Sequence, residues 1–125
     1  MGALYVQTSS TLTTSSTSFV PIPGLTFELP EGVGDVAIVT LNLPQPYATG
    51  NDYPGGVFGI SVAGNMLPNQ ACFSYSVQNG NNRIPTTLIV GVPLALKVQT
   101  VQAMWHNVRS STVILDSPSS LSAIY

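Results

Sequence analysis

Two arginines and one aspartate carry the most distinctive chemistry of this chain, because only eight of its 125 residues are charged, three Lys or Arg and five Asp or Glu. Arg83 and Arg109 each present a rigid fork of N–H donors that is always protonated. Asp116 offers the complementary acceptors. Strong donors and acceptors on an otherwise uncharged polar surface favour a neutral ligand rich in hydroxyl groups, and a sugar has that chemistry.

The same residues also have a structural interpretation. Either arginine could form an ion pair with Asp116 or Asp52 across the end of a sheet, and an exposed ion pair contributes little to stability. Tyr47 and Tyr53 lie in a polar loop that runs from residue 47 to residue 56. An exposed tyrosine can cover the apolar face of a sugar with its ring, or it can pack on its own loop. The sequence leaves both alternatives open.

Catalytic and metal sites are not indicated. His106 is the only histidine, and no G-x-S-x-G motif accompanies it, so we expect a structural histidine that is either solvated or hydrogen-bonded. A glycosidase needs two carboxylates about 5–10 Å apart on either side of the scissile bond, and the sequence does not indicate such a pair. Asn51-Asp52 is a weak calcium candidate, because calcium prefers several clustered oxygen ligands. We therefore expect binding without catalysis, metal or cofactor.

Length and charge limit the remaining functions. A chain of 125 residues is typical of one domain, which we assign to residues 1–125. The net charge is −2 without a basic stripe, so nucleic acid is not an expected partner. The nearly apolar run Leu88–Leu96 is far shorter than the ~20 residues of a membrane helix. No signal peptide is visible, and we expect synthesis in the cytoplasm with action outside the cell or at its surface.

The low charge of the chain predicts association between copies, and its apolar segments predict which residues are buried. A surface with so little charge has weak protection against association, which favours a symmetric oligomer. The apolar end Ile124–Tyr125 is expected to be buried in a sheet or against another subunit. Cys72 is the only cysteine, and its apolar neighbours Ala71 and Phe73 predict a small buried side chain.

Short β-prone segments separated by ten prolines and eleven glycines predict an all-β chain. The expected strands are Leu25–Leu29, Val36–Leu43, Val57–Val62, Ala71–Val77, Thr86–Val92, Leu94–Trp105, Ser110–Leu115 and Leu121–Tyr125, after an extended segment Thr8–Phe19. Val36–Leu43 is apolar on both faces, as expected between two layers. The alternation within Leu94–Trp105 slips by one residue, which indicates a bulge. Closely spaced strands of this kind favour a β-sandwich or jelly roll.

Several short segments, in the same order along the chain, resemble a known family. They are Pro44–Asn51, Tyr53–Gly55, Cys72–Ser76 and Leu121–Ile124, together with Phe19–Leu25 and Asp116–Ser117. These segments resemble the fucose-binding N-terminal lectin domain of a Burkholderia superlectin, which has a tumour-necrosis-factor-like (TNF-like) fold. The resemblance implies a jelly-roll sandwich assembled as a homotrimer. It also implies calcium-independent binding of fucosylated glycans at sites between neighbouring protomers.

Matching positions imply the residues of such a site. One protomer would contribute Tyr47, Ser74, Tyr75, Arg109, Asp116 and Ser117, and its neighbour Arg83 with the turn Gly80–Asn82. Possible further contacts are Tyr53, Val57, Asn81 and Asn82. Val57 stands where the family has a tyrosine, and Gly80 and Asn81 replace a hydroxyl-bearing pair, so the preferred sugar is left open. A structural jelly-roll module, such as an adhesin tip or capsid-like module that binds protein, is the alternative function.

Overall fold

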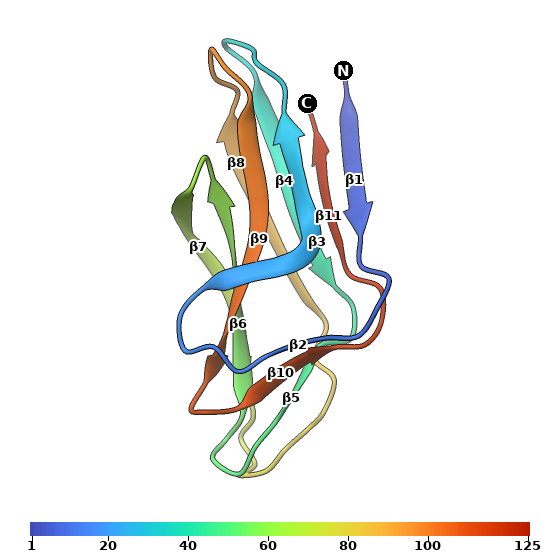
Figure 1. Cartoon of the computed structure of the whole chain (residues 1–125), viewed down its shortest axis with the longest axis vertical. Helices are drawn as coiled ribbons and strands as arrows, with labels where there is room; N and C mark the ends of the chain where they lie inside the picture. Colours follow the sequence, from blue (N-terminus) through green and yellow to red (C-terminus); the bar gives the residue numbers. More distant parts are fainter.

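The computed structural model describes all 125 residues. They form eleven β-strands joined by loops, without a helix (Figure 1). The strands are β1 (Ala3–Gln7), β2 (Leu12–Thr14), β3 (Val20–Leu29), β4 (Val36–Leu43), β5 (Tyr47–Thr49), β6 (Gly55–Val62), β7 (Asn65–Ser74), β8 (Thr86–Pro93), β9 (Gln99–Val108), β10 (Thr112–Leu115) and β11 (Ser120–Ile124). The structure contains no helix that is long and apolar enough to cross a lipid bilayer.

The strands form a sandwich of two four-stranded sheets and one small sheet. The order is β1-β11-β4-β8 in one large sheet and β3-β9-β6-β7 in the other. A three-stranded sheet, β2-β10-β5, runs obliquely across the lower end of the molecule (Figure 1). Strands that are neighbours in a sheet are mostly distant in sequence, as in a jelly roll. The predicted all-β jelly-roll class is therefore confirmed.

Alternating side chains from the two large sheets fill the space between them, because successive residues of a strand point to opposite faces. Val101, Ala103 and Trp105 of β9 are buried, and Phe58 of β6 lies opposite Trp105. The rings of Phe58 and Trp105 have centroids 6.5 Å apart. Full burial of a side chain the size of Phe58 stabilises a fold by ~1.5–3 kcal/mol.

Most predicted strands are confirmed, with shifted ends. Of the segment Thr8–Phe19, only the residues of β2 form a strand. β1 and β5 were not expected: β1 is largely apolar and was missed, and β5 is short and directly follows Pro46. The predicted bulge in Leu94–Trp105 is wrong: β9 begins only at Gln99 and pairs with β6 without a register shift. The pairing of β9 with β3 does shift, but the extra residues lie in β3, between Pro21 and Thr26. The slip in alternation instead marks the loop before β9, which Gly32 N holds through a 2.7 Å hydrogen bond to Ala95 O.

Two burial predictions are also wrong. β4 buries one face only, and Val36 and Ile38 on its other face are 53% and 48% exposed. Nothing in this chain covers that side of the sheet, so the apolar residues there do not mark a strand between two layers. Cys72 is exposed on the edge strand β7, because alternation places its neighbour Phe73 inside and the cysteine outside. The C-terminal strand β11 lies in a sheet between β1 and β4, but Ile124 at its end is 56% exposed, so the chain itself does not bury this apolar end as expected.

Candidate functional site

Arg83 and Asp116 form a bidentate ion pair near β5 and β10. Arg83 precedes β8, and its Nη1 and Nη2 donate to the two carboxylate oxygens of Asp116 at 2.5 and 2.8 Å. Nη1 also donates to Gln45 O at 3.1 Å, and the guanidinium carbon lies 4.6 Å from the centroid of the Tyr47 ring. Stacking on a tyrosine face and a forked carboxylate contact together fix the plane of this guanidinium.

The pair is accessible and carries both charges at neutral pH. The side chains of Arg83 and Asp116 are 43% and 29% exposed. The hydrogen bond from Arg83 holds the pKa of Asp116 below its ordinary value, and the same contact raises the pKa of Arg83. A carboxylate has about four lone-pair sites, so Asp116 keeps acceptors for a ligand. Nε of Arg83 makes no hydrogen bond within the chain and remains a donor.

Arg109 forms a second cluster in the turn between β9 and β10. Its Nε donates to the backbone oxygens of Asp52 and Tyr53 at 3.0 and 3.1 Å, and Nη2 donates to Tyr53 O at 2.7 Å. Nη2 also donates to Ser74 Oγ at the end of β7. Nη1 has no partner within the chain. These contacts fix one edge of the guanidinium and leave the other edge as a donor for a ligand.

Backbone strain is concentrated at this cluster. Arg109 and Ser110 have φ angles of 50° and 59°, and Val108 O accepts a 3.2 Å hydrogen bond from Ser111 N, as in a type I′ turn. Such turns favour Asn and Gly, because a side chain in the left-handed region costs about 1–2 kcal/mol. Tyr53, whose carbonyl Arg109 contacts, has a φ of 50°. Strain of this kind gathers at functional sites.

Tyr75 connects the two clusters. Its ring is buried, and its hydroxyl accepts a 3.0 Å hydrogen bond from Ala48 N and donates to Asn82 O. Burial raises the pKa of the phenol. The preceding Ser74 contacts Arg109, and Asn82 directly precedes Arg83. Tyr75 therefore ties the loop that carries Arg83 to β5 from inside the sandwich. Its contact with sugar, which the resemblance implies, stays a prediction.

The other predicted residues lie around these clusters. Tyr53 is 43% exposed. Val57 lies on the outer face of the β3-β9-β6-β7 sheet and pairs with Cys72. This pair is two residues along the strands from the pair Gly55–Ser74. Asn81 lies in the exposed turn before Arg83. Ser117 Oγ, next to Asp116, is buried without a hydrogen-bond partner in the chain.

The segments that carry the two arginine clusters gather at the lower end of the molecule, around β5, β10 and the loop before β8 (Figure 1). Arg83 pairs with Asp116 of its own chain. This is one of the ion pairs that the sequence allowed as a structural role for the arginines. His106 is structural as expected: Nδ1 lies 2.6 Å from Asn107 O, and Phe19 packs edge-on at 4.6 Å. No three His, Cys, Asp or Glu side chains come together as a metal site.

Sequence reasoning missed the backbone contacts of the site. The carbonyl oxygens of Gln45, Asp52 and Tyr53 orient the arginines. The direction of a backbone carbonyl cannot be predicted from residue types. It also missed Ser111, whose buried hydroxyl donates to Gly55 O at 2.9 Å and ties the Arg109 turn to β6. The sequence Arg109-Ser110-Ser111 between two β-prone segments marks a turn, but not this bond.

The model of the Bc2l-C N-terminal domain family matches residues 4–124. The chain belongs to this family. Bc2l-C is a Burkholderia lectin, so the resemblance seen in the sequence is confirmed. Comparison with curated protein sequences finds no significant match for this Bc2l-C-type domain.

Solved structures share the fold of this Bc2l-C-type domain. Eiger TNF from S. frugiperda has a TM-score of 0.57 at 15% identity, with 97% of this chain and 90% of that chain covered. The Bacillus thuringiensis delta-endotoxin Cry8Ea1 has a TM-score of 0.50 at 13% identity over 91% of this chain, which spans only 19% of the toxin. The C-terminal domain of EclA, a sugar-binding protein, has a TM-score of 0.47 at 11% identity, with 90% and 78% covered. The likeness to Eiger TNF places the domain among TNF-like folds.

The ion pair makes a prediction about titration. Because the folded pKa of Asp116 is lowered, the pair persists above the ordinary aspartate pKa and is lost only as the pH falls through the lowered value. Arg83→Ala should therefore raise the pKa of Asp116, which carbon-detected NMR titration of the carboxyl groups measures. Arg109→Ala, which removes no contact of Asp116, is the control. An unchanged Asp116 titration in Arg83→Ala would contradict the pairing.

The strained turn makes a prediction about stability. Ser110→Gly should raise the free energy of unfolding by about 0.5–1 kcal/mol, because glycine adopts the positive φ of this position without strain. Denaturant unfolding at fixed protein concentration measures the change. Ser18→Gly, at an exposed loop position without a positive φ, should be neutral or destabilising. Equal effects of the two substitutions would mean that position 110 is unstrained.

Proposed function

We propose that this protein is a non-enzymatic, calcium-independent lectin that binds fucosylated glycans between neighbouring protomers of a homotrimer. One observation carries the proposal: a chain of a lectin family concentrates its two arginine clusters at one end, with donors and acceptors still free. These groups are Nη1 of Arg109, Nε of Arg83 and the remaining lone pairs of Asp116. We propose that it acts on surface glycans outside the cell.

A neutral sugar suits these groups. Hydroxyls donate to and accept from charged partners, and such charge-assisted bonds are about twice as strong as neutral ones. Both guanidinium groups are held by backbone oxygens, so little side-chain freedom is lost on binding. Fucose also carries a methyl group, which requires an apolar neighbour. Tyr53 and Val57 offer such surface near Ser74 and Arg109.

The electrostatics of the site favour binding over hydrolysis. The lowered pKa of Asp116 keeps it ionised, so it cannot act as a general acid at neutral pH. Asp52 contributes only its carbonyl oxygen to the Arg109 cluster. Calcium independence follows the same logic, because the Arg83 guanidinium already occupies the carboxylate that would attract a cation.

An uncovered apolar surface supports the trimer. We call it the apolar sheet face, the outer side of the β1-β11-β4-β8 sheet. Strand register sets its residues in rows, and its members are Ala3, Tyr5, Val36, Ile38, Thr40, Ile89, Gly91, Pro93, Ser122 and Ile124. The next row on the same side of the sheet is polar and bounds this face: Gln7, Ser120, Asn42 and Thr87. Tyr5, Ile89 and Ile124 are 63%, 61% and 56% exposed, and no charged residue interrupts these rows.

A soluble monomer rarely exposes a contiguous apolar surface of this kind. A second copy of the chain is the partner that we propose for it. Assembly through this face would place the arginine clusters of several protomers in one particle. Several modest sugar sites on one particle raise avidity when a glycan array engages them together.

Substitution of the arginines tests the sugar site. Arg109→Ala and Arg83→Ala should each weaken binding to fucosylated glycans by about tenfold or more, because each removes charge-assisted donors. Isothermal titration with methyl α-L-fucoside, with and without EDTA, measures affinity and calcium dependence. Lys97→Ala, in the loop before β9, should bind normally. A folded wild-type protein that ignores every fucosylated glycan would exclude this function.

Charge on the apolar sheet face tests the assembly. Ile38→Lys should convert a trimer to monomers, since a buried ammonium without a partner opposes association, whereas Leu96→Lys in an exposed loop should leave the trimer intact. Light scattering coupled to size exclusion measures the mass. A monomeric wild-type protein would reject the trimer, and capture of a protein partner insensitive to sugar would favour the structural-module alternative.

A further inference from the structure

A buried asparagine lies beneath the strained turn that carries Arg109. Alternation along β9 points Val101, Ala103 and Trp105 into the core, and Asn107 takes the next inward position, where it is 6% exposed. An apolar side chain would continue this row, whereas a buried amide is unfavourable unless its polar atoms find partners. The reason for an amide at this position must therefore lie in its contacts.

Asn107 joins three segments of the chain at the turn. Its Nδ2 donates to Ser111 O at 2.8 Å and to Ser15 O at 3.2 Å, and its backbone N–H donates to Ser16 O at 2.8 Å. Because both acceptors of Nδ2 are carbonyl oxygens, which cannot donate, only this orientation of the amide pairs both of them. Asn107 thus bridges the two ends of the turn 108–111 and fastens it to the loop between β2 and β3.

Ser111 holds the same turn from the side of β6. This serine is buried, its hydroxyl donates to Gly55 O at 2.9 Å, and Gly55 N donates to the hydroxyl oxygen at 3.3 Å. We call Asn107 and Ser111 the turn clamp, because together they tie the turn to two different neighbours, the loop before β3 and the beginning of β6.

The turn clamp opposes the strain of the turn itself. Arg109 and Ser110 have φ angles of 50° and 59°, a conformation that is unfavourable for residues with a side chain. If the turn relaxed, the Ser111 carbonyl would lose its buried hydrogen bond from Asn107, and a buried acceptor without a partner is also unfavourable. The clamp therefore keeps the backbone of Arg109 in a conformation that its intrinsic preference opposes.

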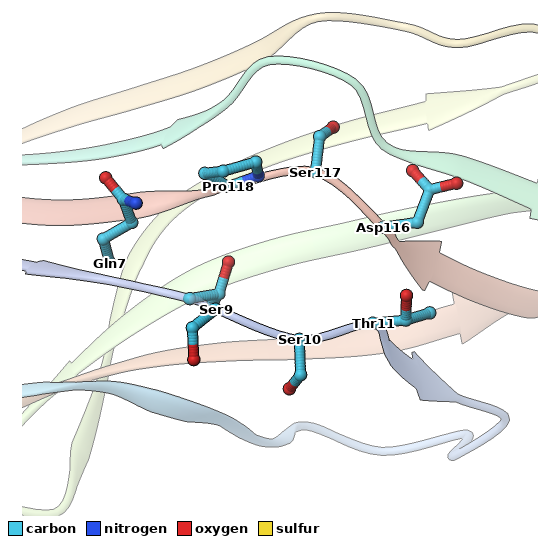
Figure 2. A pocket seen from close by; sticks show the side chains of 8 residues that line it. Gln7, Ser9, Ser10, Thr11, Asp116, Ser117 and Pro118 are labelled. Atoms are coloured by element: carbon cyan, nitrogen blue, oxygen red, sulfur yellow. The ribbon is translucent and has the colours of Figure 1, made fainter.

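The turn clamp also fixes the beginning of β10, the strand that lies between the Arg109 turn and Asp116. Because β10 pairs with β2 on one side and with β5 on the other, it forms a rigid connection. Figure 2 shows Asp116 at the far end of this strand, where it lies opposite Thr11 across a polar hollow. The clamp therefore relates the position of Arg109 to that of Asp116.

We propose that Asn107 and Ser111 are positioning residues for Arg109, which hold its guanidinium in the orientation that binds sugar. The inference rests on the proposed function and deepens it, because it assigns the direction of one sugar donor to two buried residues. The carbonyl oxygens of Asp52 and Tyr53 orient the guanidinium only while the turn keeps it within their reach. Without the clamp the turn relaxes, and Nη1 of Arg109 no longer points at a fixed place.

The test compares variants that remove similar amide contacts at different places. Asn107→Leu keeps the branched shape of the side chain but removes its donors. Gln102→Met is the matched control, because Gln102 lies near the beginning of β9 and its Nε2 also donates to backbone oxygens, those of Ile22 and Leu25, at 3.3 and 3.2 Å. Asn107→Leu/Ser110→Gly lacks the clamp donors but also lacks the strain, since glycine adopts a positive φ readily.

NMR provides a readout that needs no ligand. Arg83 and Arg109 are the only arginines, so the arginine Nε–H region of a nitrogen-edited spectrum contains their signals alone. The Nε–H of Arg109 donates to Asp52 O and Tyr53 O and should exchange slowly with water. The Nε–H of Arg83 makes no hydrogen bond within the chain and serves as the reference for rapid exchange.

Asn107→Leu should accelerate exchange of the Arg109 Nε–H by about tenfold and weaken binding of methyl α-L-fucoside by a similar factor in calorimetry. Gln102→Met should lower the stability of the fold but leave both quantities within about twofold of wild type. Asn107→Leu/Ser110→Gly should bring both back to within about threefold of wild type. Ser111→Ala, a milder change, should act in the same direction as Asn107→Leu and replaces it as the test variant should Asn107→Leu not fold.

The outcomes separate the turn clamp from the proposed function. Unchanged exchange of the Arg109 Nε–H in folded Asn107→Leu or Ser111→Ala overturns the positioning role. Equal acceleration in Gln102→Met, or no recovery when Ser110→Gly is added, does the same, because lost stability alone would then explain the result. Wild-type protein that gives the expected exchange pattern but binds no fucoside overturns the proposed function, whereas the hold of the clamp on Arg109 stands.

Discussion

The buried hydroxyl of Tyr75 is the interaction on which the candidate site depends. It joins the backbone of β5 at Ala48 to the loop at Asn82, and it does so inside the sandwich. The next residue along the loop, Arg83, can then reach Asp116, while the preceding Ser74 reaches Arg109. One phenol thus sets the relative position of two cations that lie far apart in sequence. Burial raises its pKa, so the contact persists from neutral to moderately basic pH.

The shortage of charge gives this geometry its significance. With eight charged residues in the chain, each arginine has few charged partners. Arg83 is held mainly by the Asp116 carboxylate, and Arg109 mainly by the backbone oxygens of Asp52 and Tyr53. The turn at Arg109 and Ser110 keeps two non-glycine residues at positive φ, against their intrinsic preference. A purely structural turn could use Asn-Gly at no such cost. Strain and rigid cations in one place are what a pre-organised recognition site requires.

The sequence predicted the fold class well, because alternation and turn residues report local structure. It placed β4, β8, β10 and β11 closely, but it misread Val36–Leu43 as buried on both sides and Cys72 as buried. Both errors have one origin, since apolar composition alone does not show which face of a strand points away from the core. The arginines and Asp116 were found from their rarity and from family resemblance. The pairing of Arg83 with Asp116 and the bridging role of Tyr75 depend on contacts between distant segments, which residue types do not encode.

The place of β11 between β1 and β4 has a consequence for how the polypeptide acquires its structure. The first strand of the chain can enter its sheet only beside the last, with Ala3 paired to Ile124. A nascent chain cannot complete this sheet until β11 has left the ribosome. Contacts between such remote positions slow folding to the millisecond-to-second range typical of β-sandwiches. During that interval the strand edges of β4 and the unpaired β1 are open to other chains, which makes synthesis the stage at which aggregation competes most strongly.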